Sequence, residues 1–123
     1  MDINSIYEKG ISLECIENRV FIKGNIESKM PGEFMTPFFD QLHNQIIKEN
    51  IKELYVDITG LTFLNSNGIK ELAKWLMKIL ILPQENQYKV IFICDRKMVW
   101  QETSITTLTF LNPNLIFKKF INE

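Results

Sequence analysis

The sequence predicts a single α/β domain over residues 1–123, built from a mixed, largely parallel β-sheet and about three helices. Two strand-like segments near the N-terminus are separated by only two residues, which indicates a hairpin. Later strand-like runs alternate with helical patterns, which favours parallel strands joined by crossover helices. Hydrophobic residues make up 46% of the 123 residues, enough for one core and too few for two ordinary domains.

The N-terminal part predicts a hairpin of residues 11–16 and 19–26, joined at Glu17 and Asn18. Within the second strand, Gly24 indicates a position where the backbone needs freedom or makes a close approach. The polar residues 27–32 then indicate a loop, because they contain the pair Pro31-Gly32.

A first helix is predicted to begin at Thr36 and Pro37. Threonine is a common N-cap, and proline suits the first helical position because its missing amide needs no partner there. The apolar stripe that follows ends near Asn50 and consists of Phe38, Phe39, Leu42, Ile46 and Ile47.

The centre of the chain predicts a strand, a polar turn and a second helix. Residues 54–58 are rich in β-branched and aromatic side chains, which favours a strand. The helix, roughly residues 67–80, is indicated by apolar residues at helical spacing, namely Ile69, Leu72, Ala73, Leu76 and Ile79. The turn between them is made of types preferred at N-caps, namely Asn65, Ser66, Asn67 and Gly68. In the helix, Trp75 is expected to pack in the core.

Three further elements complete the predicted fold. Residues 88–94 form a continuous apolar run, which predicts an interior strand covered on both faces. A helix over residues 99–111 and a strand over residues 115–121 follow. Functional crevices in such sheets lie beyond the carboxyl ends of the strands. We therefore expect the turn after Gly24 and the turn at residues 65–68 to lie at that edge.

Composition excludes several classes of function. The formal net charge of −1, from 14 basic and 15 acidic residues, gives no field for nucleic acid. The N-terminus lacks a signal-peptide pattern, and no apolar run approaches the ~20 residues that cross a bilayer. A cytoplasmic protein without membrane insertion is therefore expected. Cys15 and Cys94 are expected as reduced thiols, and with a single histidine, His43, we expect neither a metal site nor a cofactor.

Catalytic motifs are also missing from the sequence. It contains no glycine-rich phosphate loop and no nucleophile elbow, and Ser66 has no neighbouring base. Asp57 is expected to be a carboxylate that hydrogen-bonds nearby amides. The residues therefore predict a protein that is not an enzyme.

The residues from Leu54 to Ile69 resemble the signature of STAS domains, the fold of bacterial anti-sigma factor antagonists. That signature is an apolar strand ending in Asp, a spacer with Phe or Ile, and Asp-Ser-Ser-Gly-Leu opening a helix. The positions in register are Asp57, Phe63, Ser66, Gly68 and Ile69. Residues 23–27 also look like the family's Gly-Glu-Leu-Asp, with Gly24 matching and Glu27 in place of Asp.

The resemblance implies a role in partner switching in signal transduction and transcription regulation. Antagonists of this family bind a serine kinase of the histidine-kinase-like ATPase type, which is the anti-sigma factor. The kinase phosphorylates the second serine of the motif, and a PP2C-type phosphatase reverses the modification. The implied partner-binding residues here are Gly24, Asn25, Glu27, Asn65, Ser66, Asn67, Gly68 and Lys70.

The sequence departs from the family at the decisive position. The acceptor serine aligns with Asn67, which has no hydroxyl, and the preceding aspartate aligns with Asn65. Three consequences stay open: constitutive partner binding, transfer of phosphorylation to Ser66, or a different regulatory interaction. Two alternatives also stay open: a small-molecule or anion-binding α/β protein that uses Asp57 and the helix terminus, or an accessory subunit of a larger assembly.

Overall fold

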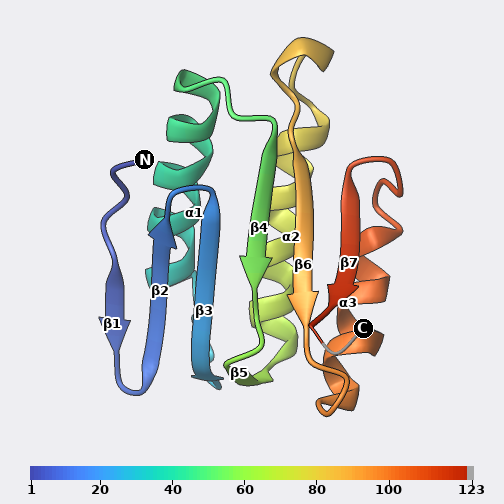
Figure 1. Cartoon of the computed structure of the whole chain (residues 1–123). Coiled ribbons are helices and arrows are strands. Elements are labelled where there is room, and N and C mark those ends of the chain that lie inside the picture. The colour runs from blue at the N-terminus through green and yellow to red at the C-terminus, as the bar shows by residue number, and fades with distance from the viewer. Residues whose placement is uncertain (122–123) are drawn as a thin grey trace.

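The protein folds into one seven-stranded β-sheet packed against three α-helices, as seen in a computed structural model that describes residues 1–121 (Figure 1). The predicted fold class is confirmed; the last two residues of the predicted domain lie outside the described residues. In chain order the elements are β1 (Ile6–Glu8), β2 (Ile11–Ile16), β3 (Arg19–Ile26), α1 (Gly32–Lys48), β4 (Glu53–Asp57), β5 (Leu61–Leu64), α2 (Ser66–Leu80), a 3-10 turn (Gln84–Asn86), β6 (Lys89–Cys94), α3 (Val99–Thr109) and β7 (Ile116–Phe120).

The sheet is mixed, and its strand order is β1-β2-β3-β4-β6-β7. The strands β1, β2 and β3 pair antiparallel, whereas β3–β4, β4–β6 and β6–β7 pair parallel. The short strand β5 lies off this path and pairs parallel with the end of β3. The predicted hairpin and the parallel crossovers are therefore both present.

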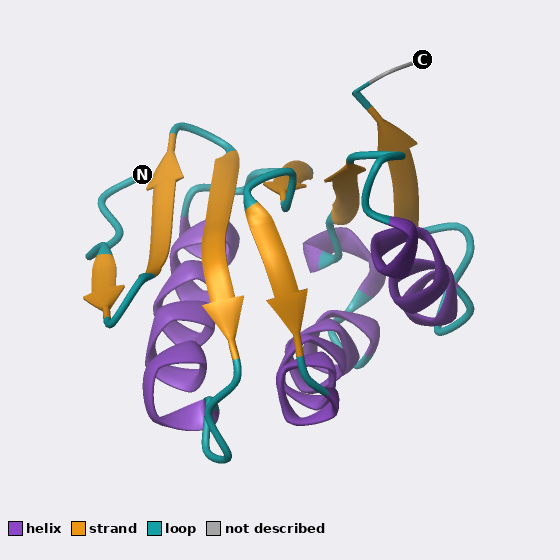
Figure 2. Ribbon diagram, turned by 90° about the horizontal axis from the view of Figure 1, so that it is seen from below, coloured by secondary structure: helices purple, strands orange, loops and turns teal. Residues whose placement is uncertain are grey.

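All three helices lie on one face of the sheet (Figures 1 and 2). The core between them holds fully buried side chains such as Val56 and Phe92. On the opposite face the described residues place no helix, and Tyr55, Ile91 and Phe117 are only half-buried. The prediction that residues 88–94 are covered on both faces is therefore wrong. The apolar run reflects the position of β6 between β4 and β7 in the sheet.

Helix α1 begins at Gly32, and the predicted start at Thr36 and Pro37 is wrong. Pro31 already has helical dihedrals, with φ −66° and ψ −16°, and its carbonyl accepts hydrogen bonds from the next turn. Phe34 and Met35 are buried, so packing against the core extends the helix toward the N-terminus. Pro37 consequently lies inside the helix, near its beginning.

Two strands that the sequence did not predict complete the sheet, and both are short. β1 has three residues at the sheet edge, and β5 has four residues that pair only with β3. β1 leads into a turn whose Gly10 carbonyl oxygen lies 1.8 Å from where a Cβ on Gly24 would be. Gly24 also has φ +103°, so the predicted close approach is confirmed.

Candidate functional site

The segment after β3 and the N-terminus of α2 meet at one edge of the sheet, as expected. The backbone amide of Asn65 donates to the carbonyl of Ile26 at 3.0 Å, which joins the start of α2 to the end of β3. We call the surface formed around residues 24–30 and 65–70 the polar edge; most of these residues are exposed or half-buried, and Ile26 and Gly68 are buried beneath it. It contains every residue that the sequence implied as partner-binding.

At the polar edge, a side chain caps the N-terminus of α2. The Oδ1 of Asn65 accepts the backbone N–H of Gly68 at 2.8 Å, so the helix begins one residue earlier than predicted, at Ser66. Ser66 and Asn67 are exposed. Gly68 is buried, and a Cβ there would lie 2.3 Å from Leu64 Cδ1, so only glycine fits without movement.

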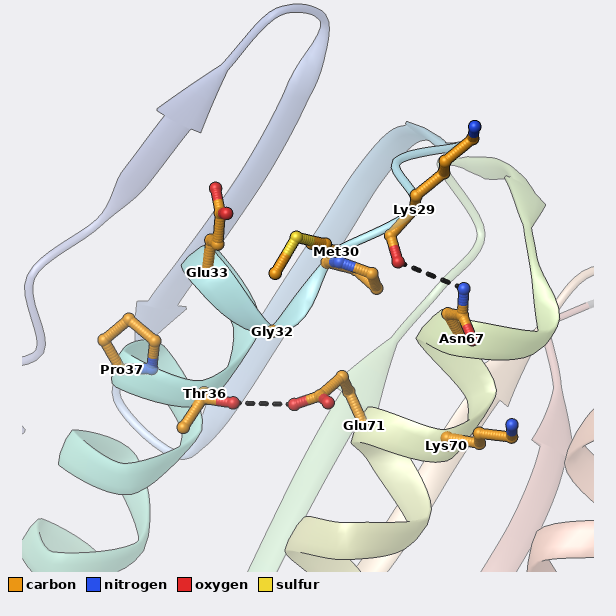
Figure 3. A pocket seen from close by; sticks show the side chains of 10 residues that line it. Lys29, Met30, Gly32, Glu33, Thr36, Pro37, Asn67, Lys70 and Glu71 are labelled. Carbon is orange, nitrogen blue, oxygen red and sulfur yellow. Dashed lines mark hydrogen bonds between the residues drawn. The ribbon is translucent and has the colours of Figure 1, made fainter.

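The two asparagines of this turn also reach across to the segment after β3. Asn65 Nδ2 donates to the carbonyl of Ser28 at 2.7 Å. Asn67 Nδ2 donates to the carbonyl of Lys29 at 3.1 Å, a contact shown in Figure 3. Sequence reasoning missed Ser28 and Lys29, because they contribute backbone carbonyls, which any residue type provides. The loop signal at residues 27–32 was the only indication of them.

A groove of about 500 Å³ opens between the N-termini of α1 and α2 (Figure 3). One wall is residues 29–33 with Thr36 and Pro37, and the other is Asn67, Lys70 and Glu71. Met30 lies at its mouth with 64% of its surface exposed. The groove therefore offers an apolar contact beside polar and charged groups.

Glu71 bridges the two helices within the wall of the groove. Its Oε1 accepts the Thr36 hydroxyl at 2.7 Å, and Lys74 lies 3.1 Å from the same oxygen. The hydrogen bond from Thr36 lowers the pKa of Glu71 against the opposing effect of burial, and Lys74 lowers it further. The bridge is therefore a carboxylate at neutral pH.

Of the eight implied residues, Asn67 and Lys70 line this groove and the other six do not. Thr62 of β5 donates to the Gly24 carbonyl at 3.1 Å and hydrogen-bonds Asn25 Oδ1. Gly24 and Asn25 are thus engaged with β5, while Glu27 is exposed. The implied residues therefore fall into two groups, one beside β5 and one at the groove.

Asp57 lies away from the polar edge, on the face of the sheet without helices. Its Oδ2 accepts from Arg19 at 2.8 Å, and its Oδ1 accepts from the amide and hydroxyl of Thr59 at 2.9 and 2.7 Å. Burial opposes ionisation, but these hydrogen bonds outweigh it and lower the pKa of Asp57. The expected amide contact is confirmed. A small-molecule site that uses Asp57 and the helix terminus would need a pocket lined by Asp57 and Ser66. Neither residue lines the groove between α1 and α2.

Within residues 1–121, no group of three or more His, Cys, Asp or Glu side chains is arranged to hold a metal ion. In the same range, no helix combines the length and apolarity needed to cross a membrane. Cys94 is buried, Cys15 is half-buried, and both are free thiols.

Comparison with solved structures bears on the fold. No family model and no curated protein sequence matches this chain. The chain is similar to the crystal structure of an anti-sigma factor antagonist from Mycobacterium paratuberculosis, with a TM-score of 0.53 and 18% identity over 94% of this chain and 86% of that one. An identity this low speaks to the fold alone. The chain has the STAS fold of anti-sigma factor antagonists, as the motif around residues 54–69 suggested.

Proposed function

We propose that this chain is a non-enzymatic signalling module that binds a partner protein through the polar edge. The supporting observation is that residues 24–30 and the tip of α2 converge on one exposed surface of a STAS fold. Backbone groups, amide side chains and Met30 offer a partner both hydrogen bonds and apolar contact.

The proposed partner is a serine kinase of the histidine-kinase-like ATPase type acting as an anti-sigma factor. A PP2C-type phosphatase is a second partner class of the same pathway. The proposal draws on the sequence resemblance around Ser66 and Gly68 together with the shared fold. It places the module in the bacterial cytoplasm, where these partners act.

Constitutive binding is the proposed regulatory state. A phosphate would add roughly two negative charges to the polar edge, which is how a switch at this surface would act. Asn67 has no hydroxyl to accept one, and its amide already donates to Lys29. We therefore propose that the module behaves as a permanently unphosphorylated antagonist.

Affinity capture from the source cell tests partner binding. The bait is the full chain, compared with Lys70→Glu on the polar edge and with Lys48→Glu at the far end of α1; both lysines are exposed. The expected result is that wild type and Lys48→Glu retain an ATPase-type kinase or phosphatase, whereas Lys70→Glu loses it. Recovery of neither class by the wild-type chain would refute the proposal.

Phosphorylation by the captured kinase tests the loss of the switch. Intact-mass spectrometry after incubation with ATP should show no stoichiometric gain for wild type and a single phosphate for Asn67→Ser. A phosphate on wild type that disappears in Ser66→Ala would instead mean that the switch has moved by one residue.

A further inference from the structure

We propose that Asn65 and Asn67 are positioning residues that hold residues 27–30 in one conformation, so that the polar edge is formed before any partner arrives. The inference rests on the proposed function, because it explains how that surface would be kept permanently ready for binding. It concerns the regulation of the site and adds no ligand.

Few other contacts hold the segment, although at its end the carbonyl of Met30 accepts the backbone amide of Glu33 at 3.2 Å. All four residues from position 27 to position 30 are exposed, so no side chain of the segment is anchored in the core. One local contact, from the amide of Met30 to the hydroxyl of Ser28 at 3.0 Å, lies within the segment itself. Two consecutive carbonyls, of Ser28 and Lys29, are held by the two asparagine amides of α2.

Both contacts require a side chain that donates. A carboxamide carries an N–H donor as well as an acceptor oxygen, whereas an ionised carboxylate only accepts. Asn65 uses both functions, because its oxygen caps Gly68 while its nitrogen binds Ser28. An aspartate at position 65 would still cap the helix but would direct negative charge at the Ser28 carbonyl.

Asn67 has no capping duty that would explain its side chain. It is exposed in the first turn of α2, and Figure 3 shows its amide directed at the Lys29 carbonyl across the mouth of the groove. The contact fixes one wall of the groove relative to the other. A partner then meets a surface that is already ordered, which lowers the entropy lost on binding.

The double variant Asn65→Asp/Asn67→Asp separates positioning from stability. Aspartate caps helices as well as asparagine does, and negative charge in a first helical turn is favourable, so α2 itself should be unharmed. The two contacts to the segment, however, should be lost. Asn44→Asp, an exposed residue of α1 with the same change in charge, is the matched control.

The measurement is ¹⁵N relaxation on the isolated full-length chain, with thermal melting in parallel. Backbone order parameters at residues 28–30 should fall from about 0.85 to below about 0.6 in the double variant, with an unchanged or higher Tm. Wild type and Asn44→Asp should both stay near 0.85. Unchanged order parameters in the double variant would overturn the inference, and so would a drop in Tm with loosening throughout the chain. No partner is needed, so the outcome is independent of the capture experiment.

Discussion

The N-termini of α1 and α2 lie side by side at the same edge, yet they are held by different means (Figure 3). At α2, a side chain caps the helix, because Asn65 accepts the amide of Gly68. At α1, no side chain caps the helix, and the carbonyl of Pro31 accepts the amides of Phe34 and Met35 instead. The start of α2 is therefore fixed by a capping side chain, whereas the start of α1 is fixed by backbone hydrogen bonds and core packing.

This difference has consequences for how each tip responds to substitution. The tip of α2 is tight, because Gly68 packs on Leu64 and Ile26 with no room for a methyl group. The tip of α1 is looser, because the three atoms nearest to a Cβ on Gly32 would all belong to the carboxylate of Glu71, the end of a flexible side chain. We therefore expect the same kind of substitution to have opposite effects at the two tips.

Gly68→Ala should have the largest effect. The added Cβ would lie 2.3 Å from Leu64 Cδ1 and 3.2 Å from Ile26 Cγ2, so Leu64 must move within the core. We expect a loss of about 3 kcal/mol of unfolding free energy, the upper end of the usual range for overpacking. Urea denaturation measures it, and a Gly68→Ala chain as stable as wild type would contradict the comparison.

Tyr88→Phe tests whether the difference is confined to the tips. Farther along the helices, the Tyr88 hydroxyl accepts from Trp75 of α2 at 3.0 Å and lies 2.7 Å from His43 Nδ1 of α1. Removal of the hydroxyl leaves Trp75 Nε1 and His43 Nδ1 without this hydrogen-bond partner and should cost about 2 kcal/mol of unfolding free energy. Hydrogen exchange should then rise in both helices; a rise in only one would show that they are held unequally along their whole length.

Thr36→Val tests the bridge between the tips. The variant removes the donor to Glu71, so the pKa of Glu71 should rise and the chain should lose about 1 kcal/mol at pH 7. The lowered pKa stabilises the folded state above the ordinary value of 4.5, and this contribution is lost as the pH falls through the folded-state pKa. Denaturation curves of the two chains should therefore converge in acid. A difference independent of pH would mean that the bridge acts only through packing.

Gly32→Ala should have the smallest effect and the opposite sign. The new Cβ would lie 3.1 to 3.3 Å from the Glu71 carboxylate, which can shift by a few tenths of an ångström. Alanine favours a helix over glycine by up to about 1 kcal/mol, so we expect a net gain of about 0.5 kcal/mol. Thermal melting measures it, and a marked loss would mean that α1 is as tightly fitted as α2.

The same contrast explains what the sequence could predict. The sequence predicts the start of α2 to within one residue, because the side chain of Asn65 caps the helix and residues 65–68 are types that favour helix starts. The predicted start of α1 differs from the observed one by five residues, because Thr36-Pro37 has the residue types of a helix start while backbone bonds to Pro31 set the true one. A side-chain cap can be predicted from the residue types at a helix start, whereas an extension of the helix by core packing cannot.

Long-range contacts were beyond the sequence for a related reason. The strand β5 is stabilised by β3 and by the buried Gln101 of α3, whose Nε2 donates to the carbonyls of Ile58 and Leu61 at 2.7 and 2.9 Å. No spacing rule connects position 101 with position 61. The reach of Asn65 and Asn67 to the segment after β3 was hidden in the same way.

The asparagine at position 67 has a consequence for how a cell would control this module. Under the proposed function, a surface that carries no modifiable group at that position has no reversible off state. Its occupancy then depends on copy number relative to the binder, as in a titration. Synthesis and proteolysis would take over the task that a kinase and a phosphatase perform elsewhere, and stoichiometry would become the signal.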